Sequence, residues 1–150
     1  MKTKALLVLA FSLFSASSYA ENCVLEVGVA DNMNFTPATL EISKSKCSSV
    51  TVKLSHSGAM QRAVMGHNWV LSATADSQSV SQAGWAAGLD NQYLPQGDAR
   101  IIAGSDVIGG GESTSVTFDT AGLEAGGDYT FFCSFVGHYA IMKGKFTVAE

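Results

Sequence analysis

Short runs in which apolar and polar residues alternate dominate the sequence, and segments rich in glycine separate them. Alternation with a period of two is typical of strands that bury one face, so each run predicts one half-buried strand of an antiparallel sheet. The predicted strands cover residues 23–29, 40–42, 49–54, 68–72, 100–103, 112–118, 129–133 and 144–148. About eight short strands with turn-forming connections indicate an all-β fold, specifically a Greek-key β-sandwich in one domain.

Residues 76–89 have helical spacing instead. Val80, Ala83 and Ala87 fall on one face of a helix with about 3.6 residues per turn. Two glycines inside the stretch weaken the pattern, because glycine is a poor helix former. We therefore expect one short helical flap outside the sheets.

The first twenty residues have the pattern of a secretory signal peptide. Two lysines precede an apolar stretch that ends at Phe14, and Ser18 and Ala20 are the small residues expected before a cleavage site. The apolar stretch is too short to span a bilayer. We expect cleavage after Ala20, export to the periplasm, and a single domain of residues 21–150 with no membrane insertion.

The charge of the chain excludes some classes of partner. Nine Lys and Arg stand against thirteen Asp and Glu, and removal of the two signal-peptide lysines leaves seven against thirteen, a net charge of −6. No run of basic residues occurs. This composition argues against nucleic acid and against an anionic membrane surface as partners.

A cluster of possible metal ligands lies between the last two predicted strands. Cys133, His138 and Met142 follow one another at gaps of five and four residues, on a loop short enough to direct them to one point. Thiolate, imidazole and thioether together suit copper. The alternative is a half-buried cysteine, a surface histidine and a core methionine that lie close by chance.

Three cysteines are an odd number for an exported protein, in which thiols normally pair. If Cys133 is a metal ligand it must remain a thiolate, so the predicted disulfide joins Cys23 to Cys47. The other pairings leave an idle thiol open to oxidation. The predicted bridge closes a loop of about 25 residues and contributes about 3 kcal/mol in the chain-entropy account.

A metal held by one loop alone would be poorly fixed, so a further ligand from another segment is expected. His67 lies at the start of the predicted strand 68–72, and His56 lies just after the predicted strand 49–54. Either histidine could reach the end of the sandwich. Spacing alone leaves both open as the second imidazole.

Two motifs together resemble those of the blue copper proteins of the cupredoxin family. They are Gly66-His67-Asn68-Trp69 and Cys133-Ser-Phe-Val-Gly-His138-Tyr-Ala-Ile-Met142-Lys-Gly. The likeness extends over essentially the whole chain after the signal peptide, and includes the pair Cys23 and Cys47. It implies a cupredoxin-like sandwich.

The resemblance also implies a ligand set for one type 1 copper ion. His67, Cys133 and His138 would bind in a plane, Met142 would be a weak axial ligand, and the carbonyl oxygen of Gly66 would lie on the opposite side. Such a site offers no open position to a substrate. The implied function is therefore electron transfer in the periplasm by cycling between Cu(II) and Cu(I), and not enzyme catalysis.

Two further residues are expected to tune the site. The resemblance implies that the backbone N–H groups of Asn68 and Phe135 donate to the thiolate sulfur, which withdraws electron density and tunes the reduction potential. The Asn68 side chain is expected to tie the two ligand-bearing loops together. His56 matches a buried histidine that is not a ligand, either a satisfied polar group or a pH-dependent modulator.

An apolar docking surface around His138 is implied as well, because exposed apolar patches usually mark partner sites. Its members are Met33, Met60, Val64, Met65, Trp85, Val136, Gly137, Tyr139 and Ala140. Val136 stands where proline is common in the family and Tyr139 where a small residue is common, which leaves the reduction potential open. The implied partners are redox proteins such as c-type cytochromes or copper- or haem-containing reductases, and the protein is expected to be a monomer.

Two other classes of function deserve comparison. A copper-delivery protein usually has methionine-rich runs, whereas this chain has five methionines and no such run. A thiol enzyme would use Cys133 and His138 as a nucleophilic pair, and it would need an orienting group and an oxyanion hole that the sequence does not reveal. Zinc could fill the site of a recombinant sample, as a misloaded form.

Overall fold

The computed structural model describes residues 21–150, so the predicted signal peptide lies outside the described residues. Within them the strands are β1 (Glu21–Val29), β2 (Thr39–Ser43), β3 (Cys47–His56), β4 (Val70–Ala73), β5 (Ala103–Gly104), β6 (Ser113–Asp119), β7 (Tyr129–Phe132) and β8 (Lys143–Ala149). The helical segments are α1 (Arg62–Met65), α2 (Thr74–Ala87), and the 3₁₀ turns η1 (Leu89–Asn91) and η2 (His138–Ala140). The expected all-β fold with a helical flap is confirmed. None of the described helices is long and apolar enough to cross a bilayer.

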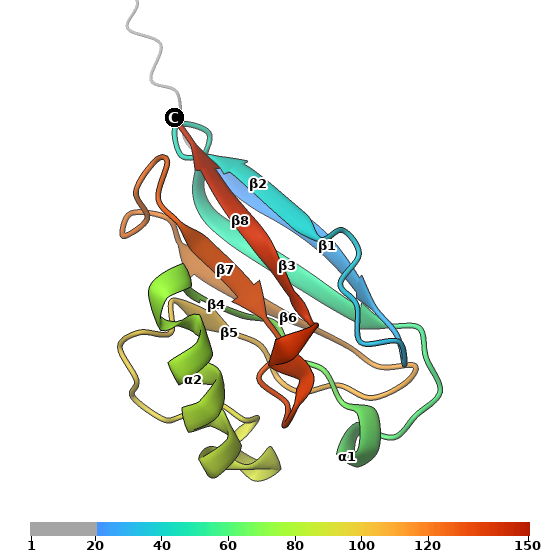
Figure 1. Cartoon of the computed structure of the whole chain (residues 1–150). Coiled ribbons are helices and arrows are strands. Elements are labelled where there is room, and N and C mark those ends of the chain that lie inside the picture. The colour runs from blue at the N-terminus through green and yellow to red at the C-terminus, as the bar shows by residue number, and fades with distance from the viewer. Residues whose placement is uncertain (1–20) are drawn as a thin grey trace, which may run out of the picture.

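The strands form two sheets that lie one behind the other (Figure 1). One sheet has the order β1-β3-β6 and the other the order β2-β8-β7-β4-β5. The expectation of wholly antiparallel pairing is wrong for two pairs, because β1 runs parallel to β3 and β2 runs parallel to β8. Alternation records which face of a strand is buried but not its direction. The chain visits the other sheet between β1 and β3, which gives it room to return in the same direction.

Aromatic side chains fill the space between the sheets. Trp69 is fully buried, and its ring lies 6.0 Å from Phe118, 5.9 Å from Phe131 and 6.3 Å from Phe146. Trp69 comes two residues after His67 and immediately before β4. The core therefore anchors the segment that carries this histidine.

Helix α2 lies outside the five-stranded sheet, near β4 and β7 (Figure 1). It begins two residues before the predicted stretch and ends at Ala87, where Gly88 adopts a left-handed φ of 75°. Gly84, which weakens the helical pattern, is required by packing, because a Cβ there would lie 2.2 Å from the carbonyl oxygen of Tyr93. This close approach brings the helix against the segment that follows η1.

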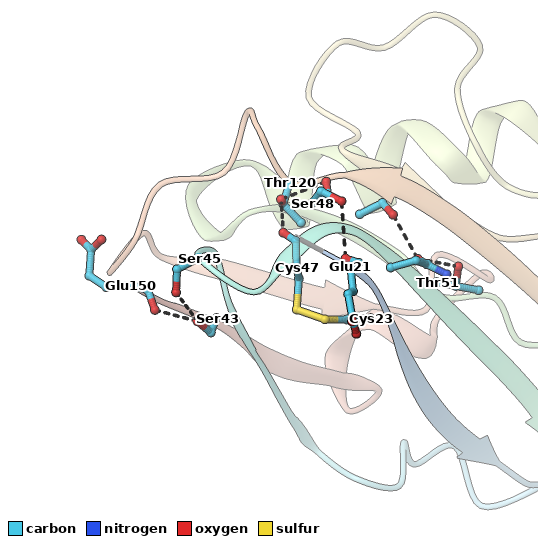
Figure 2. Close-up of a disulfide and its surroundings, with 11 residues drawn as sticks. Glu21, Cys23, Ser43, Ser45, Cys47, Ser48, Thr51, Thr120 and Glu150 are labelled. Atoms are coloured by element: carbon cyan, nitrogen blue, oxygen red, sulfur yellow. Dashed lines mark hydrogen bonds between the residues drawn. A yellow bond between two sulfur atoms is a disulfide. The ribbon is translucent and has the colours of Figure 1, made fainter. Parts of the chain in front are cut away.

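The disulfide and the possible metal ligands lie at opposite ends of the sandwich. Cys23 and Cys47 are joined with a Cα–Cα distance of 5.5 Å, as predicted. Figure 2 shows this bridge in the region where Ser43, at the end of β2, donates to the carbonyl oxygen of Glu150, the residue after β8. The loop from Cys133 to Met142 lies instead where β8 begins, at the same end as α1 (Figure 1).

Candidate metal centre

Three possible metal ligands come together from two distant segments. His67 lies between α1 and β4, and two backbone hydrogen bonds of 2.9 Å join it to Ile108. Cys133 directly follows β7, and its N–H donates to the carbonyl oxygen of Met142 at 3.0 Å, which closes the loop. His138 begins the turn η2 within that loop. All three donor atoms lie within 4.8 Å of one another.

The distances between the donor atoms fit a metal ion at their centre. Nδ1 of His67 lies 3.2 Å from Nδ1 of His138, and Sγ of Cys133 lies 3.9 Å from the first and 3.6 Å from the second. The point equally distant from these three atoms is about 2.1 Å from each, which matches bonds of about 2.0–2.3 Å from a metal ion to imidazole nitrogen and thiolate sulfur. The protein therefore holds its donors at bonding geometry.

A hydrogen bond behind His67 selects the nitrogen that faces the site. Nε2 of His67 lies 2.9 Å from the carbonyl oxygen of Ala30, to which it can only donate. The proton is therefore on Nε2, and the lone pair of Nδ1 points toward the other donors. Met142 is fully buried, and its N–H donates to the carbonyl oxygen of His138 at 2.8 Å. This turn holds the backbone of Met142 against that of His138.

Burial opposes charge on every donor. It raises the pKa of the Cys133 thiol to about 12, although the backbone N–H groups of Asn68 and Phe135 counteract part of this effect by donating to the sulfur. Burial lowers the pKa of His67 to about 4 and also lowers the pKa of His138. Without metal the site therefore holds a neutral thiol and two neutral imidazoles. A catalytic thiol needs a depressed pKa, so this environment argues against a nucleophilic enzyme.

The Asn68 side chain connects the two ligand-bearing segments, as predicted. Its Oδ1 accepts from the N–H of Ser134 at 2.9 Å, and its Nδ2 donates to Oγ of Ser134 and to the carbonyl oxygen of Gln92, each at 2.8 Å. Asn68 and Ser134 are both fully buried. These bonds fix the residue after His67 to the residue after Cys133.

The structure separates the two histidines that spacing left open. His67 contributes to the donor cluster, whereas the His56 ring stacks on the outer side of His67 with centroids 4.9 Å apart and planes inclined by 15°. His56 accepts from the N–H of Gly58 through Nδ1 at 3.0 Å, and its Nε2 then donates to the carbonyl oxygen of Met65 at 3.2 Å. It is a satisfied buried histidine, and its role as a modulator stays a prediction.

The predicted docking residues differ in exposure. Met60, Val64, Trp85 and Val136 are 40%, 57%, 42% and 49% exposed. Gly137 and Ala140 are also exposed, whereas Met33, Met65 and Tyr139 are only partly so. Sequence reasoning missed Ile141, which is 58% exposed between two ligands. An apolar residue in a loop carries no signal of its direction, so only the fold could reveal it.

Tyr139, which is only partly exposed, packs against helix α2 and strand β7. Its hydroxyl lies 2.8 Å from Oγ of Ser77 on α2, and its ring meets Phe132 edge-on with centroids 5.5 Å apart. The ammonium of Lys143 lies 4.6 Å from the centre of the tyrosine ring. Tyr139 thus ties the ligand loop to the helix in addition to contributing surface.

Known proteins are similar to this chain in sequence and in fold. The family described as copper binding proteins, plastocyanin/azurin family, matches residues 21–149. Azurin from Bordetella pertussis is 55% identical over 137 residues, which cover 91% of each chain, and azurin from Pseudomonas aeruginosa is 46% identical over 99% of each. The solved structure of azurin Az-iso2 from the methylotroph Methylomonas sp. strain J superposes with a TM-score of 0.82 at 40% identity, covering 85% of this chain and 98% of that one.

The match covers the segments that carry the donor cluster and extends through both sheets. The chain therefore belongs to the plastocyanin/azurin family of copper-binding proteins, and it is a blue copper electron carrier, not an enzyme, with a type 1 site of His67, Cys133, His138 and Met142.

Proposed function

We propose that this carrier exchanges single electrons with other periplasmic redox proteins through the surface around His138. The observation that carries the proposal is the exposure of the ligands. His138 is 5% exposed, whereas His67, Cys133 and Met142 are completely buried. Electronic coupling between redox centres falls steeply with distance. The imidazole of His138 therefore provides the shortest path from the metal to a docked partner.

The surroundings of His138 suit a transient contact. Phe135 stacks on its ring with centroids 4.6 Å apart, and Val136 and Ile141 project beside it with about half of their surface exposed. We define the docking surface as the nine predicted residues, Met33, Met60, Val64, Met65, Trp85, Val136, Gly137, Tyr139 and Ala140, together with Ile141. Small apolar contacts of this kind allow a partner to bind and leave quickly.

The protein contributes rigidity to the electron transfer. Bound copper would supply a one-electron couple between Cu(II) and Cu(I), for which thiolate and imidazole are acceptable ligands in both states. The hydrogen bonds of His67 to Ala30 and of Asn68 to Ser134 fix the positions of the segments that carry the donors. Donors that need not move when an electron arrives keep the reorganisation cost low. We propose that the carbonyl oxygen of Gly66, on the same segment as His67, would be a further weak ligand to the copper ion.

The proposed location is supported by the chain's relatives and by its first residues. Export to the periplasm agrees with the signal pattern that ends at Ala20 and with the similarity to bacterial azurins. Soluble c-type cytochromes and copper- or haem-containing reductases are the proposed partners, and the protein is proposed to act as a monomer.

A matched pair of substitutions tests the docking surface. Val136 is 49% exposed beside His138 and Val24 is 48% exposed on β1. Val136→Asp should lower the second-order rate of electron exchange with a soluble c-type cytochrome about tenfold or more, which corresponds to about 1.4 kcal/mol. Val24→Asp should leave the rate within about twofold. Equal rates for the two variants, at unchanged reduction potential, would exclude this surface as the route.

A further inference from the structure

Two side chains outside the ligand set join the segments that surround His67. Arg62 on α1 donates from Nε to the carbonyl oxygen of Val107 at 2.9 Å and from Nη2 to Oε1 of Gln92 at 2.8 Å. The same Oε1 of Gln92 accepts from the N–H of Val107 at 2.8 Å. Both backbone groups of Val107 are thus held by these side chains. We call this closed ring of three hydrogen bonds the Arg62–Gln92 strut.

The charged guanidinium of Arg62 makes hydrogen bonds to uncharged oxygens and no ion pair within the described residues. None of the ion pairs between described residues includes Arg62, so no carboxylate lies within 4.0 Å of its guanidinium. Its partners are uncharged oxygens, including a longer contact of 3.5 Å to the carbonyl of Leu89. Hydrogen bonds from an ionised donor are stronger than neutral ones, and the planar guanidinium fixes their directions.

One end of the strut reaches the segment that carries His67. A Cβ on Gly66 would lie 2.3 Å from the carbonyl oxygen of Arg62 and 2.6 Å from Cγ1 of Val107, so Gly66 packs directly against both residues. Ile108, which follows Val107, makes the two backbone hydrogen bonds to His67. A shift of Arg62 or Val107 would therefore move the backbone on either side of His67.

The other end of the strut reaches the Cys133 side of the site. The carbonyl oxygen of Gln92 accepts from Nδ2 of Asn68 at 2.8 Å, and the carbonyl oxygen of Tyr93 accepts from Oγ of Ser134 at 2.8 Å. The backbone N–H of Asn68 donates to the sulfur of Cys133. The position of Gln92 thus determines the position of a group that contacts the thiolate.

The backbone at Gln92 is held in a conformation that needs support. Gln92 and Tyr93 have φ values of 59° and 52°, in the left-handed region that residues other than glycine adopt at an energetic cost. Their N–H groups are satisfied by the carbonyls of Leu89 and Gly88 at 2.9 Å. Two such residues in succession persist only where their surroundings hold them, and such strain clusters at functional sites.

We propose that Arg62 and Gln92 are positioning residues for the copper centre. By holding Gly66, His67 and Asn68 against the Cys133 loop, the strut fixes the position of the Gly66 carbonyl and the hydrogen bond from Asn68 to the Cys133 sulfur. Hydrogen bonds to a ligating sulfur withdraw electron density from it and tune the reduction potential. The strut therefore adjusts the potential without touching the metal.

Four single variants and the double variant Arg62→Gln with Gln92→Asn test the proposal. Arg62→Gln and Gln92→Asn each break the strut, and asparagine tolerates the left-handed backbone, so Gln92→Asn keeps the test valid if Arg62→Gln does not fold. Gln92→Glu keeps an acceptor for both Arg62 and Val107. Arg100→Gln is the matched control. It removes the same charge, but Arg100 binds Asp98 and Ser79, neither of which is a ligand or adjoins one in the sequence.

Two readouts are measured for each variant. In metal-free protein, hydrogen exchange should become about tenfold faster at the amides of Val107 and Asn68 in both strut-breaking variants. In copper-loaded protein, the same variants should shift the visible absorption band and the reduction potential. The double variant should shift them no further than the larger single change, because both residues act through one unit. Gln92→Glu should keep the absorption band of the wild type, because it retains the acceptor.

The result that overturns the proposal is a dissociation of the two readouts. If both strut-breaking variants fold and exchange faster but keep the band and the potential of Arg100→Gln, the strut is merely structural. Equal shifts in Gln92→Glu and Gln92→Asn would also overturn it, because the retained acceptor would then have no effect. Faster exchange with a shifted potential, rescued by Gln92→Glu, supports it.

Discussion

Replacing Asn68 by alanine should destabilise the metal-free protein more than any exposed polar substitution. The side chain makes three hydrogen bonds of 2.8–2.9 Å inside a fully buried site. A buried hydrogen bond contributes about 1 kcal/mol net, and a partner left unsatisfied costs about 1–3 kcal/mol. Oγ of Ser134 keeps its bond to the carbonyl of Tyr93, which limits the penalty there. We expect a loss of about 3–4 kcal/mol in the free energy of unfolding.

The matched control for this substitution is Asn91→Ala. Asn91 makes a single exposed hydrogen bond, from Nδ2 to the carbonyl oxygen of Ala87 at 2.8 Å, so its loss should cost under about 1 kcal/mol. Urea unfolding of both metal-free variants, followed by circular dichroism, measures the difference. A loss for Asn68→Ala no larger than that for Asn91→Ala would refute the view that Asn68 joins the two ligand-bearing segments.

Three further predictions concern the cysteines and the titrating groups. Removing the disulfide by Cys23→Ser with Cys47→Ser should lower the free energy of unfolding by about 3 kcal/mol. The blue colour of the copper-loaded protein should stay intact, because the bridge lies at the far end of the sandwich. Loss of the colour would contradict this prediction. Uptake of Cu(II) near pH 7 should release about one proton per ion, because the Cys133 thiol has a pKa of about 12 and the imidazoles are already neutral. A pH indicator in weak buffer measures the release. A release near zero would exclude the thiol as a ligand. The pKa of His67 is lowered from 6.5 to about 4 in the folded metal-free protein, so stability present above about pH 6.5 should fall by up to about 3 kcal/mol through this group as the pH drops toward 4. Urea unfolding across this range should show a smaller loss in His67→Gln than in wild type, because only the lowered pKa of His138 then remains, and an equal loss in the two proteins would contradict the assignment.

Local patterns in the sequence predict those parts of the site that lie close together in the chain. Cys133, His138 and Met142 share one loop between two strands, so their convergence follows from loop length alone. The disulfide was predictable on a different ground, because the assignment of Cys133 as a ligand leaves only Cys23 and Cys47 to pair. Alternating residues locate the strands to within a few positions, apart from the predicted strand 100–103, of which only Ala103 lies in a strand, β5.

Contacts between distant segments could not be predicted from these patterns. His56 and His67 both stand at strand ends, and only the stacking of one ring behind the other distinguishes the ligand from its neighbour. The partners Arg62 and Gln92 are separated by 30 residues, and both look like ordinary polar residues in the sequence. The parallel pairing of β1 with β3 and of β2 with β8 could not be predicted either, because alternation does not encode strand direction.

A redox titration of the copper-loaded protein tests the central claim most directly. Wild-type protein with one equivalent of Cu(II) should show an intense blue absorption that bleaches on addition of one electron and returns on oxidation, because the Cys133 thiolate binds the ion in both states. The Cys133→Ser variant should bind copper without this colour. A colourless complex of the wild-type protein, or a blue colour that survives Cys133→Ser, would contradict the account.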